Sequence, residues 1–365
     1  MIPLSIIIPC YRVEKYLRRC LDSLVSQSLE GTELVCVNDG SPDKCLSILK
    51  EYRERYGDRI VVIDKENEGV WKARMDGIAA ASGEYIGFID PDDYVKPDYA
   101  MKLYNTALTY DADIAVCGFD RVSDGSAHTY SREMTGFKYD CFDIRKDPGL
   151  LTEVNAAPWN KIFKASLAKG FRSLEKIPPA LDDMMFSELL YKDAGVMAFV
   201  RESLIIYTVR EDSIINSINP SLVPSIYASM AELRRVFVLE RPEMLTYVDA
   251  SAFLHLGISL MYRLCPMGHR DGVCGPWSHG DGVCGPWSHR NVSFARILEK
   301  NTAFLDRYFP LWRKNPYISL PFVIRHRGSN LKLLIVRTVY GLGMFPLFLK
   351  VYTGMIKYLK IDVKW

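Results

Sequence analysis

Three carboxylates are crowded into four residues at Asp90-Pro91-Asp92-Asp93. The apolar run 85–89 directly precedes them and predicts a buried strand, which Pro91 would end. Carboxylates crowded at a strand end repel one another unless a cation lies among them, and Mg²⁺ and Mn²⁺ prefer such hard oxygen ligands. The cluster therefore predicts a divalent metal site. The alternative is an acidic turn that caps the next helix.

A second pair of carboxylates, Asp182 and Asp183, opens a predicted helix. Acidic residues favour a helix N-terminus because they interact with its dipole, and this structural role explains such a pair as well as chemistry does. Two carboxylate sites in one chain could serve a displacement reaction in two ways. One takes a proton from the attacking hydroxyl, and the other holds a metal at the leaving group.

The first 120 residues alternate strand and helix patterns, so they must position these carboxylates. The predicted strands are 5–8, 34–37, 60–63, 85–89 and 113–119. The predicted helices are 13–28, one that begins at Ser41-Pro42, and 69–81, which Gly83 would end in a left-handed conformation. This alternation predicts right-handed βαβ units and an α/β fold with a Rossmann-like, mostly parallel sheet flanked by helices.

Ligands of such sheets bind at the carboxyl ends of the strands. Pro9-Cys10-Tyr11 follows the first predicted strand, and Asn38-Asp39-Gly40-Ser41 follows the second. Asp39 could accept a hydrogen bond from a nucleobase or cap a helix, and Gly40 would let a ligand approach the backbone. The first strand is not followed by Gly-x-Gly-x-x-Gly, and the sequence lacks Gly-x-x-x-x-Gly-Lys-Ser/Thr. A dinucleotide-binding dehydrogenase and a P-loop NTPase are therefore not expected.

The formal net charge of +2 conceals an asymmetry. Residues 290–365 carry 14 Lys and Arg against 3 Asp and Glu, so +11 lies in this tail and −9 in the remainder. The nine cysteines are odd in number, several lie in apolar strand-like runs, and the N-terminus lacks the basic segment of a secretory signal. These features predict reduced cysteines and a cytoplasmic location, with the basic tail on an anionic surface.

The C-terminal third mixes apolar and basic residues. Beyond the duplication at 269–288, the longest uncharged run, 338–349, is too short to span a bilayer and contains Pro346. Basic helices rich in aromatic residues suit a membrane interface, whereas the alternative is a helical subdomain packed on the catalytic core. No nucleic-acid-binding module accompanies the charge. Residues 269–288 are a tandem duplication whose Cys and His spacing does not fit the usual zinc sites, which favours an exposed loop.

Six short motifs, in order, carry a resemblance to a known family. They are Ser5-Ile-Ile-Ile-Pro-Cys-Tyr, Glu14-Lys-Tyr-Leu, Val37-Asn-Asp-Gly-Ser, Asn67-Glu-Gly-Val, Ala73-Arg and Gly83-Glu-Tyr-Ile-Gly-Phe-Ile-Asp-Pro-Asp-Asp-Tyr. Together they resemble a family 2 glycosyltransferase of GT-A fold, of the type that builds bacterial surface polysaccharides. The resemblance is close over 3–120 and looser to about 217. It implies inverting transfer of a sugar from a nucleotide donor, usually a UDP-sugar.

The resemblance implies roles for residues of the donor half. Tyr11 would lie against the uracil and Asp39 would hydrogen-bond it. Asp90 and Asp92 match the D-x-D of the family, with Asp92 as the direct ligand of Mn²⁺ or Mg²⁺. The other expected donor-site residues are Pro9, Glu14, Arg74, Arg210 and Ser213. Arg74 and Arg210 could instead form salt bridges of the fold. Arg12 and Met75 stand where the family usually has Asn, which indicates tuning of donor or acceptor contacts.

The resemblance also implies an acceptor half. Asp183 aligns with the general base, Asp182 stands where Glu is usual, and Phe186 supplies the aromatic residue that follows. Trp159, in Pro158-Trp159-Asn160-Lys161, would pack beneath the acceptor, or would simply be a core tryptophan. The expected domains are a GT-A catalytic domain, 1–217, with a nucleotide-sugar half at 1–120 and an acceptor half at 121–217, and a helical, basic region at 218–365.

These observations predict a hexosyl- or N-acetylhexosaminyl-transferase on the inner face of the cell membrane, which uses a UDP-sugar and a lipid-linked saccharide acceptor. No Gln-x-x-Arg-Trp is present, so single transfer is expected rather than processive synthesis. One alternative is a non-catalytic nucleotide-sugar-binding partner of an assembly complex. Another, a metal-dependent nucleotidyltransferase, would need a Gly-rich phosphate loop that Pro9-Cys10-Tyr11-Arg12 does not provide.

Overall fold

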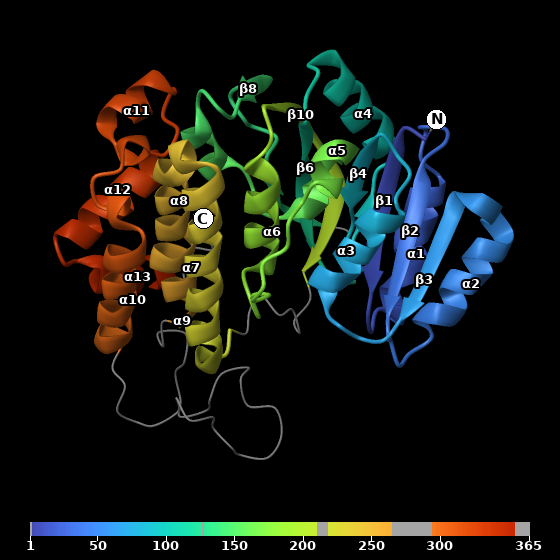
Figure 1. Ribbon diagram of the computed structural model, residues 1–365, viewed down its shortest axis with the longest axis horizontal. Helices are drawn as coiled ribbons and strands as arrows, with labels where there is room; N and C mark the ends of the chain where they lie inside the picture. Colours follow the sequence, from blue (N-terminus) through green and yellow to red (C-terminus); the bar gives the residue numbers. More distant parts are fainter. Residues whose placement is uncertain (1, 126–127, 210–217, 265–293, 355–365) are drawn as a thin grey trace. The chain divides into compact units, whose positions relative to one another are not determined.

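The computed structural model describes residues 2–125, 128–209, 218–264 and 294–354 (Figure 1). The chain forms two compact units. The first comprises 1–147, 155–173 and 182–210, and the second comprises 148–154, 174–181 and 211–365. The single boundary expected after residue 217 does not describe this division fully, because the segments 148–154 and 174–181 belong to the second unit. The duplicated segment 269–288 lies outside the described residues.

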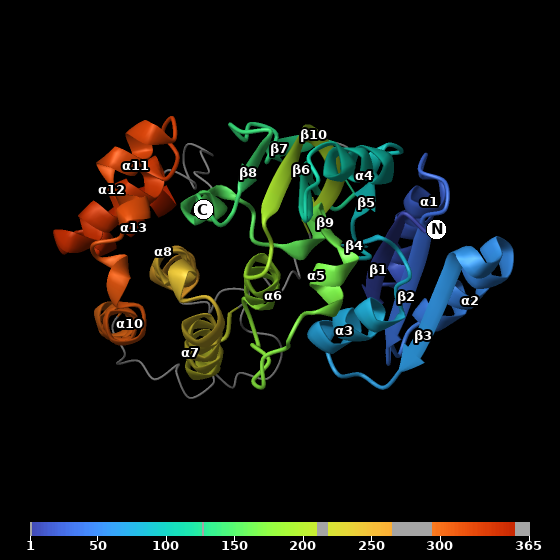
Figure 2. The ribbon, with the colours of Figure 1, turned by 45° about the horizontal axis from the view of Figure 1, so that its top comes forward.

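A ten-stranded sheet forms the centre of the first unit, and its first half is parallel. The order β3-β2-β1-β4 places the first strand in the middle, as Figures 1 and 2 show. These strands are β1 (Leu4–Cys10), β2 (Glu33–Asp39), β3 (Ile60–Lys65) and β4 (Tyr85–Phe88). The connecting helices are α1 (Glu14–Val25), α2 (Cys45–Tyr56) and α3 (Val70–Ala80). The predicted α/β class is confirmed.

The second half of the sheet is mixed. The antiparallel strand β9 (Lys161–Lys164) lies between β4 and β6 (Ile114–Ser123), and the sequence analysis did not predict it. Beyond it, β6 pairs in parallel with the long strand β10 (Val196–Val209), which is interrupted by irregular pairing near 200–205. The remaining elements are β5 (Tyr94–Val95), β7 (Thr129–Glu133), β8 (Cys141–Asp143), α4 (Tyr99–Thr109), α5 (Ala165–Lys169) and α6 (Asp182–Tyr191).

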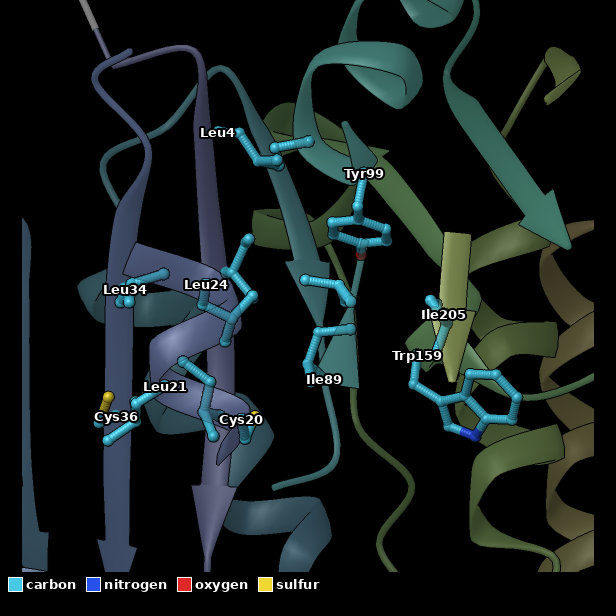
Figure 3. Packing of buried hydrophobic residues seen from close by; sticks show 14 of the residues in the cluster. Leu4, Cys20, Leu21, Leu24, Leu34, Cys36, Ile89, Tyr99, Trp159 and Ile205 are labelled. Atoms are coloured by element: carbon cyan, nitrogen blue, oxygen red, sulfur yellow. The ribbon is translucent and has the colours of Figure 1, made fainter. Parts of the chain in front are cut away.

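The core of the first unit explains the local sequence. Leu17, Cys20, Leu21 and Leu24 of α1 repeat at helical spacing and are all buried against the sheet. Figure 3 shows Leu21 and Leu24 in one cluster that extends through Ile89 and Tyr99 to Trp159 and Ile205. The six cysteines at 10, 20, 36, 45, 117 and 141 are free.

Gly83 does not have the left-handed conformation that the sequence predicted, since the described glycines with positive φ do not include it. Its lack of a side chain has another cause. A Cβ there would lie 2.5 Å from the backbone nitrogen of Ser5 and 2.7 Å from the carbonyl oxygen of Tyr85. Close packing of the turn on β1 therefore requires glycine.

The second unit is helical. Its helices are α7 (Val223–Glu240), α8 (Leu245–Ala252), a π-helix (Phe253–Leu260), α9 (Met261–Leu264), α10 (Phe294–Tyr308), α11 (Leu320–Arg325), α12 (Leu331–Gly341) and α13 (Phe345–Gly354). Phe253 stacks on Trp312 with ring centroids 4.8 Å apart. Of the described helices, the continuous stretch Pro242–Leu264 is long and apolar enough to cross a membrane, but 72% of its most apolar window is buried, as in an ordinary core helix.

Candidate active site

Arg74 is the centre of a cluster of carboxylates. It lies in α3, and its side chain is almost completely buried. Its Nη2 is 2.7 Å from Oδ1 of Asp183 and 3.7 Å from Oδ1 of Asp90, and its Nη1 is 3.5 Å from Oδ2 of Asp182. The strand end after β4 and the first turn of α6, far apart in the sequence, therefore meet at one guanidinium. Both predicted carboxylate sites belong to a single site.

The cluster contains more negative charge than Arg74 can balance. Burial and the charges of Asp183, Asp92 and Asp182 raise the pKa of Asp90 to about 7 despite the opposing effect of Arg74. Burial and Asp183 likewise raise the pKa of Asp182 to about 6. Asp90 keeps 29% of its side-chain surface exposed. An accessible carboxylate that resists ionisation because of its neighbours is well suited to a divalent cation, so the residues present fit a metal ion.

A hydrogen-bond network holds the loop 90–93 in place. Oδ1 of the buried Asp93 accepts from the backbone N–H of Thr208, at 2.7 Å, so the loop is tied to β10. Arg19 of α1 donates to the carbonyl oxygen of Asp92, at 2.8 Å, and to Oγ1 of Thr208, at 2.9 Å. The Asp92 side chain, which is only partly buried, is thus carried on a backbone fixed from two sides. Arg19 was missed, since a single arginine on an amphipathic helix gives no recognisable signal.

The loops after β1 and β2 are bound to each other. The backbone N–H of Arg12, which has φ +54°, donates to Oγ of Ser41 at 2.8 Å. Oε2 of Glu14 accepts from the backbone N–H of Lys44, also at 2.8 Å. Pro9 is buried within β1, whereas Tyr11 remains 41% exposed. The ring of Tyr11 is therefore accessible at the strand end where the sequence analysis expected a base.

Asp39 has a structural partner at the same edge of the sheet. Its carboxylate accepts from the backbone N–H groups of Glu68, at 2.9 Å, and Gly69, at 2.8 Å. A Cβ on Gly40 would lie 2.6 Å from the backbone nitrogen of Asn67. The close approach that Gly40 permits is thus made by the protein's own loop 67–69. Asp39 therefore organises the start of α3, and hydrogen bonding to uracil remains a prediction.

Aromatic side chains pack against the guanidinium of Arg74 and so support the carboxylate cluster. The guanidinium of Arg74 lies over the ring of Phe186, 5.6 Å from its centroid. Phe186 in turn makes edge contacts with Trp71 at 5.1 Å and Phe88 at 5.5 Å. This packing fixes α6 against α3 and β4, so the position of Asp183 depends on buried rings as well as on charge.

Trp159 is a core residue in this structure. It is buried, makes an edge contact with Phe119, and stacks on Tyr207 with centroids 5.2 Å apart. Lys161, two residues after Trp159, is fully buried. Its Nζ donates hydrogen bonds to the carbonyl oxygens of Asn155 and Ala157 and to Oδ1 of Asn160. Burial lowers the pKa of Lys161 to about 7. The segment 155–160 is therefore held by one internal ammonium. Arg210 and Ser213 lie outside the described residues.

Comparisons with known proteins agree with this geometry. The family model described as glycosyl transferase family 2 matches residues 5–171. The chain is 32% identical over 219 residues to glycosyltransferase GlyA of Streptococcus pneumoniae, covering 58% of this chain and 31% of GlyA. It is 29% identical to the putative glycosyltransferase EpsH of Bacillus subtilis, covering 73% of this chain and 78% of EpsH. It is 30% identical to the poly(ribitol-phosphate) beta-glucosyltransferase of Bacillus spizizenii, covering 57% of this chain and 32% of that protein.

The fold has a counterpart among solved structures. Residues 1–349 of S. aureus TarS, in complex with UDP-GlcNAc, superpose with a TM-score of 0.59 at 22% identity, covering 70% of this chain and 73% of TarS. The chain thus spans about a third of the length of GlyA and of the poly(ribitol-phosphate) glucosyltransferase, and most of the length of EpsH. Residues 5–171 match glycosyl transferase family 2, so this part of the chain is a glycosyltransferase domain, and its fold is similar to that of the GT-A glycosyltransferase TarS.

Proposed function

We propose that the protein transfers a hexosyl or N-acetylhexosaminyl group from a UDP-sugar to a lipid-linked saccharide during surface polysaccharide synthesis, with inversion at the anomeric carbon. One observation carries this proposal: Arg74 brings Asp90 of the D-x-D segment and Asp183 of α6 to the same guanidinium. Support for the donor comes from TarS, which was solved with UDP-GlcNAc. Support for a surface polymer comes from the relative named for glucosyl transfer to poly(ribitol-phosphate).

In this proposal Asp92 and Asp90 hold Mn²⁺ or Mg²⁺. When bound, the cation stabilises negative charge on the leaving diphosphate. Within the described part of the chain, no group of three or more His, Cys, Asp or Glu side chains surrounds one metal position. One or two carboxylates, completed by phosphate oxygens and water, are the usual ligands of Mg²⁺. Arg19 and Asp93 keep the backbone of Asp92 in place for this task.

Asp183 is proposed to act as the general base. It takes the proton from the acceptor hydroxyl while that oxygen attacks the anomeric carbon from the face opposite the diphosphate. The side chain of Asp183 is 33% exposed, so an acceptor can reach it. Its contact with Arg74, at 2.7 Å, fixes the orientation of the carboxylate. Asp182, the neighbour on the same turn, would contact the acceptor sugar. Trp159, which is buried, would not touch the acceptor but would support the segment 158–160 beside α6.

Tyr11 and Asp39 are proposed to bind the uracil edge, with Pro9 and Glu14 shaping the loop that carries Tyr11. Arg210 and Ser213 are proposed to contact the diphosphate. We propose that the acceptor lies on the cytoplasmic face of the membrane. The support is the charge of residues 290–365, which carry 14 Lys and Arg against 3 Asp and Glu. The enzyme would be a peripheral membrane protein that meets a lipid-linked substrate there.

Calorimetric titration with UDP, with and without Mn²⁺, tests the donor site. Wild-type protein should bind UDP more tightly with Mn²⁺, and Asp92→Ala should remove the metal dependence. Asp183→Asn should bind UDP and Mn²⁺ like the wild type but lose transfer from a UDP-sugar to lipid-linked acceptors. Normal transfer by Asp183→Asn would disprove the base assignment. Absence of UDP binding under every metal condition would overturn the proposed donor.

A further inference from the structure

Three consecutive helices of the second unit leave aliphatic side chains in solvent. Each helix presents one pair at i and i+4, so each pair lies on one face of its helix. The pairs are Leu320 and Ile324 on α11, Leu331 and Ile335 on α12, and Leu347 and Val351 on α13. Their exposed fractions lie between 46% and 72%. We call these six residues the aliphatic pairs.

The opposite faces of the same helices are packed. Phe322 and Val323 of α11, Leu333 and Val336 of α12, and Phe345 and Leu349 of α13 are buried. The helices α11 and α13 both contact α12, and Figure 1 shows the three close together within their unit. Single exposed leucines are common on protein surfaces and need no explanation. The same exposed pair on each of three neighbouring helices does need an explanation, because clusters of exposed apolar side chains mark interaction sites.

The charge around the aliphatic pairs identifies the partner. The sequence has no Asp or Glu between Asp306 and Asp362, while the same interval contains ten Lys and Arg residues. Arg325, Lys332 and Lys350, each within a turn of an aliphatic pair, are exposed. Glu153 of the same unit accepts a hydrogen bond from the backbone N–H of Asn330, but the helices themselves carry cations and no carboxylates. Aliphatic side chains beside such cations match the two layers of an anionic bilayer, in which phosphates lie above hydrocarbon.

We propose that α11, α12 and α13 form a docking surface for an anionic phospholipid bilayer, in which the aliphatic pairs enter the headgroup region and the neighbouring cations contact lipid phosphates. This inference rests on the proposed function for its biological purpose, since it would bring the first unit to lipid-linked acceptors. A second copy of the chain fits less well. A twofold contact would place the same surface against itself, and with it positive charge against positive charge.

Vesicle sedimentation with the full-length chain tests the proposal. We expect binding to vesicles of equal parts phosphatidylcholine and phosphatidylglycerol, and much weaker binding to phosphatidylcholine alone. Salt at about 1 M, where the Debye length is about 3 Å, should weaken the first interaction. The triple variant Ile324→Ser, Ile335→Ser, Leu347→Ser should lose affinity on the order of tenfold, because apolar burial and charge attraction act together.

A matched control separates this surface from general hydrophobicity. Val238 and Leu239 on α7 belong to the same unit, and Leu239 is 70% exposed. The double variant Val238→Ser, Leu239→Ser should bind vesicles like the wild type. Circular dichroism and thermal unfolding establish that both variants are folded. Equal vesicle binding by the triple variant and the wild type would overturn the proposal, as would a wild-type dimer that the triple variant converts to monomer.

UDP titration of the same samples keeps the two proposals distinguishable. The triple variant should bind UDP with Mn²⁺ as the wild type does, since its substitutions lie in the second unit. Vesicle binding without UDP binding would support the docking surface and overturn the donor assignment. UDP binding without vesicle binding would support the donor assignment and overturn the docking surface.

Discussion

Replacement of Arg74 by Met should expose how much the carboxylate cluster depends on one cation. Met keeps an unbranched side chain over Phe186 but removes the charge that faces Asp90, Asp182 and Asp183 at 2.7 to 3.7 Å. Removal of one partner from a fully buried ion pair costs about 3–5 kcal/mol. The carboxylates keep 28% to 33% of their side-chain surface exposed, so solvent should reduce the loss to about 2–3 kcal/mol. A domain is stable by about 5–15 kcal/mol in total, so Arg74→Met should still remove a large part of the stability of the first unit.

The loss should depend on pH, and its sign can be worked out. Arg74 opposes the raised pKa of Asp90 and of Asp182, so its removal raises both values further above those of the unfolded chain. A carboxyl group whose pKa is higher in the folded state binds more protons there, so the folded state gains stability as pH falls. Each pKa unit corresponds to about 1.4 kcal/mol. The variant should therefore recover part of its lost stability between about pH 7.5 and pH 5.5.

Urea titration followed by fluorine NMR of fluorotryptophan-labelled protein would measure this. The resonance of Trp71, assigned with Trp71→Phe, reports on the first unit alone. Arg18→Met is the matched control: Arg18 contacts Glu51 at 2.6 Å, but half of its side chain is exposed, so solvent screens the pair and no measurable loss is expected. A loss below about 1 kcal/mol for Arg74→Met, or a loss identical at both pH values, would refute the reasoning.

Two further perturbations test the site and its scaffold. Without metal, the first unit should lose stability as pH rises from about 4 to about 7, because Asp182 and Asp90, whose pKa values are raised in the folded state, lose their protons in this range. Mn²⁺ should therefore raise the unfolding temperature more near pH 7.5 than near pH 5.5. An equal effect of Mn²⁺ at both pH values would contradict metal binding at Asp90. Gly77→Ala should destabilise the first unit by about 1–3 kcal/mol, because its Cβ would lie 2.4 Å from Cγ2 of Ile7, whereas Gly136→Ala, with open space around it, should be neutral in the same urea titration.

Sequence reasoning found the carboxylates and the edge of the sheet at which they gather. Short apolar runs predicted the first four strands, and helical apolar spacing together with cap residues predicted the three helices. A parallel sheet places the strand ends together. The strand β9 could not be found this way. Its four residues follow the segment held by Lys161, and a short strand between two others is selected by tertiary pairing rather than by local pattern.

The role of Arg74 was left open between donor support and a salt bridge, and the reason is physical. Its partners include two residues of α6, which is more than 100 residues away in the sequence and meets α3 only through the tertiary fold. Arginine in the middle of a helix normally reaches solvent, so its burial cannot be read from α3 alone. The contacts of Asp39 with Glu68 and Gly69 were hidden for the same reason, since they join loops that follow different strands.

The electrostatics of the cluster give the proposed metal dependence a cause in this chain. The buried guanidinium of Arg74 contacts Asp90, Asp182 and Asp183, and the charge of Asp92 acts on Asp90 as well. The diphosphate of a donor would bring further negative charge to the same edge of the sheet. Burial and the neighbouring carboxylates raise the pKa of Asp90, so its protonation could relieve part of the repulsion as pH falls. A divalent cation relieves it near neutral pH without the need to protonate a carboxylate of the cluster. Tight UDP binding should therefore require the cation, and weak metal-free binding should improve as Asp90 becomes protonated.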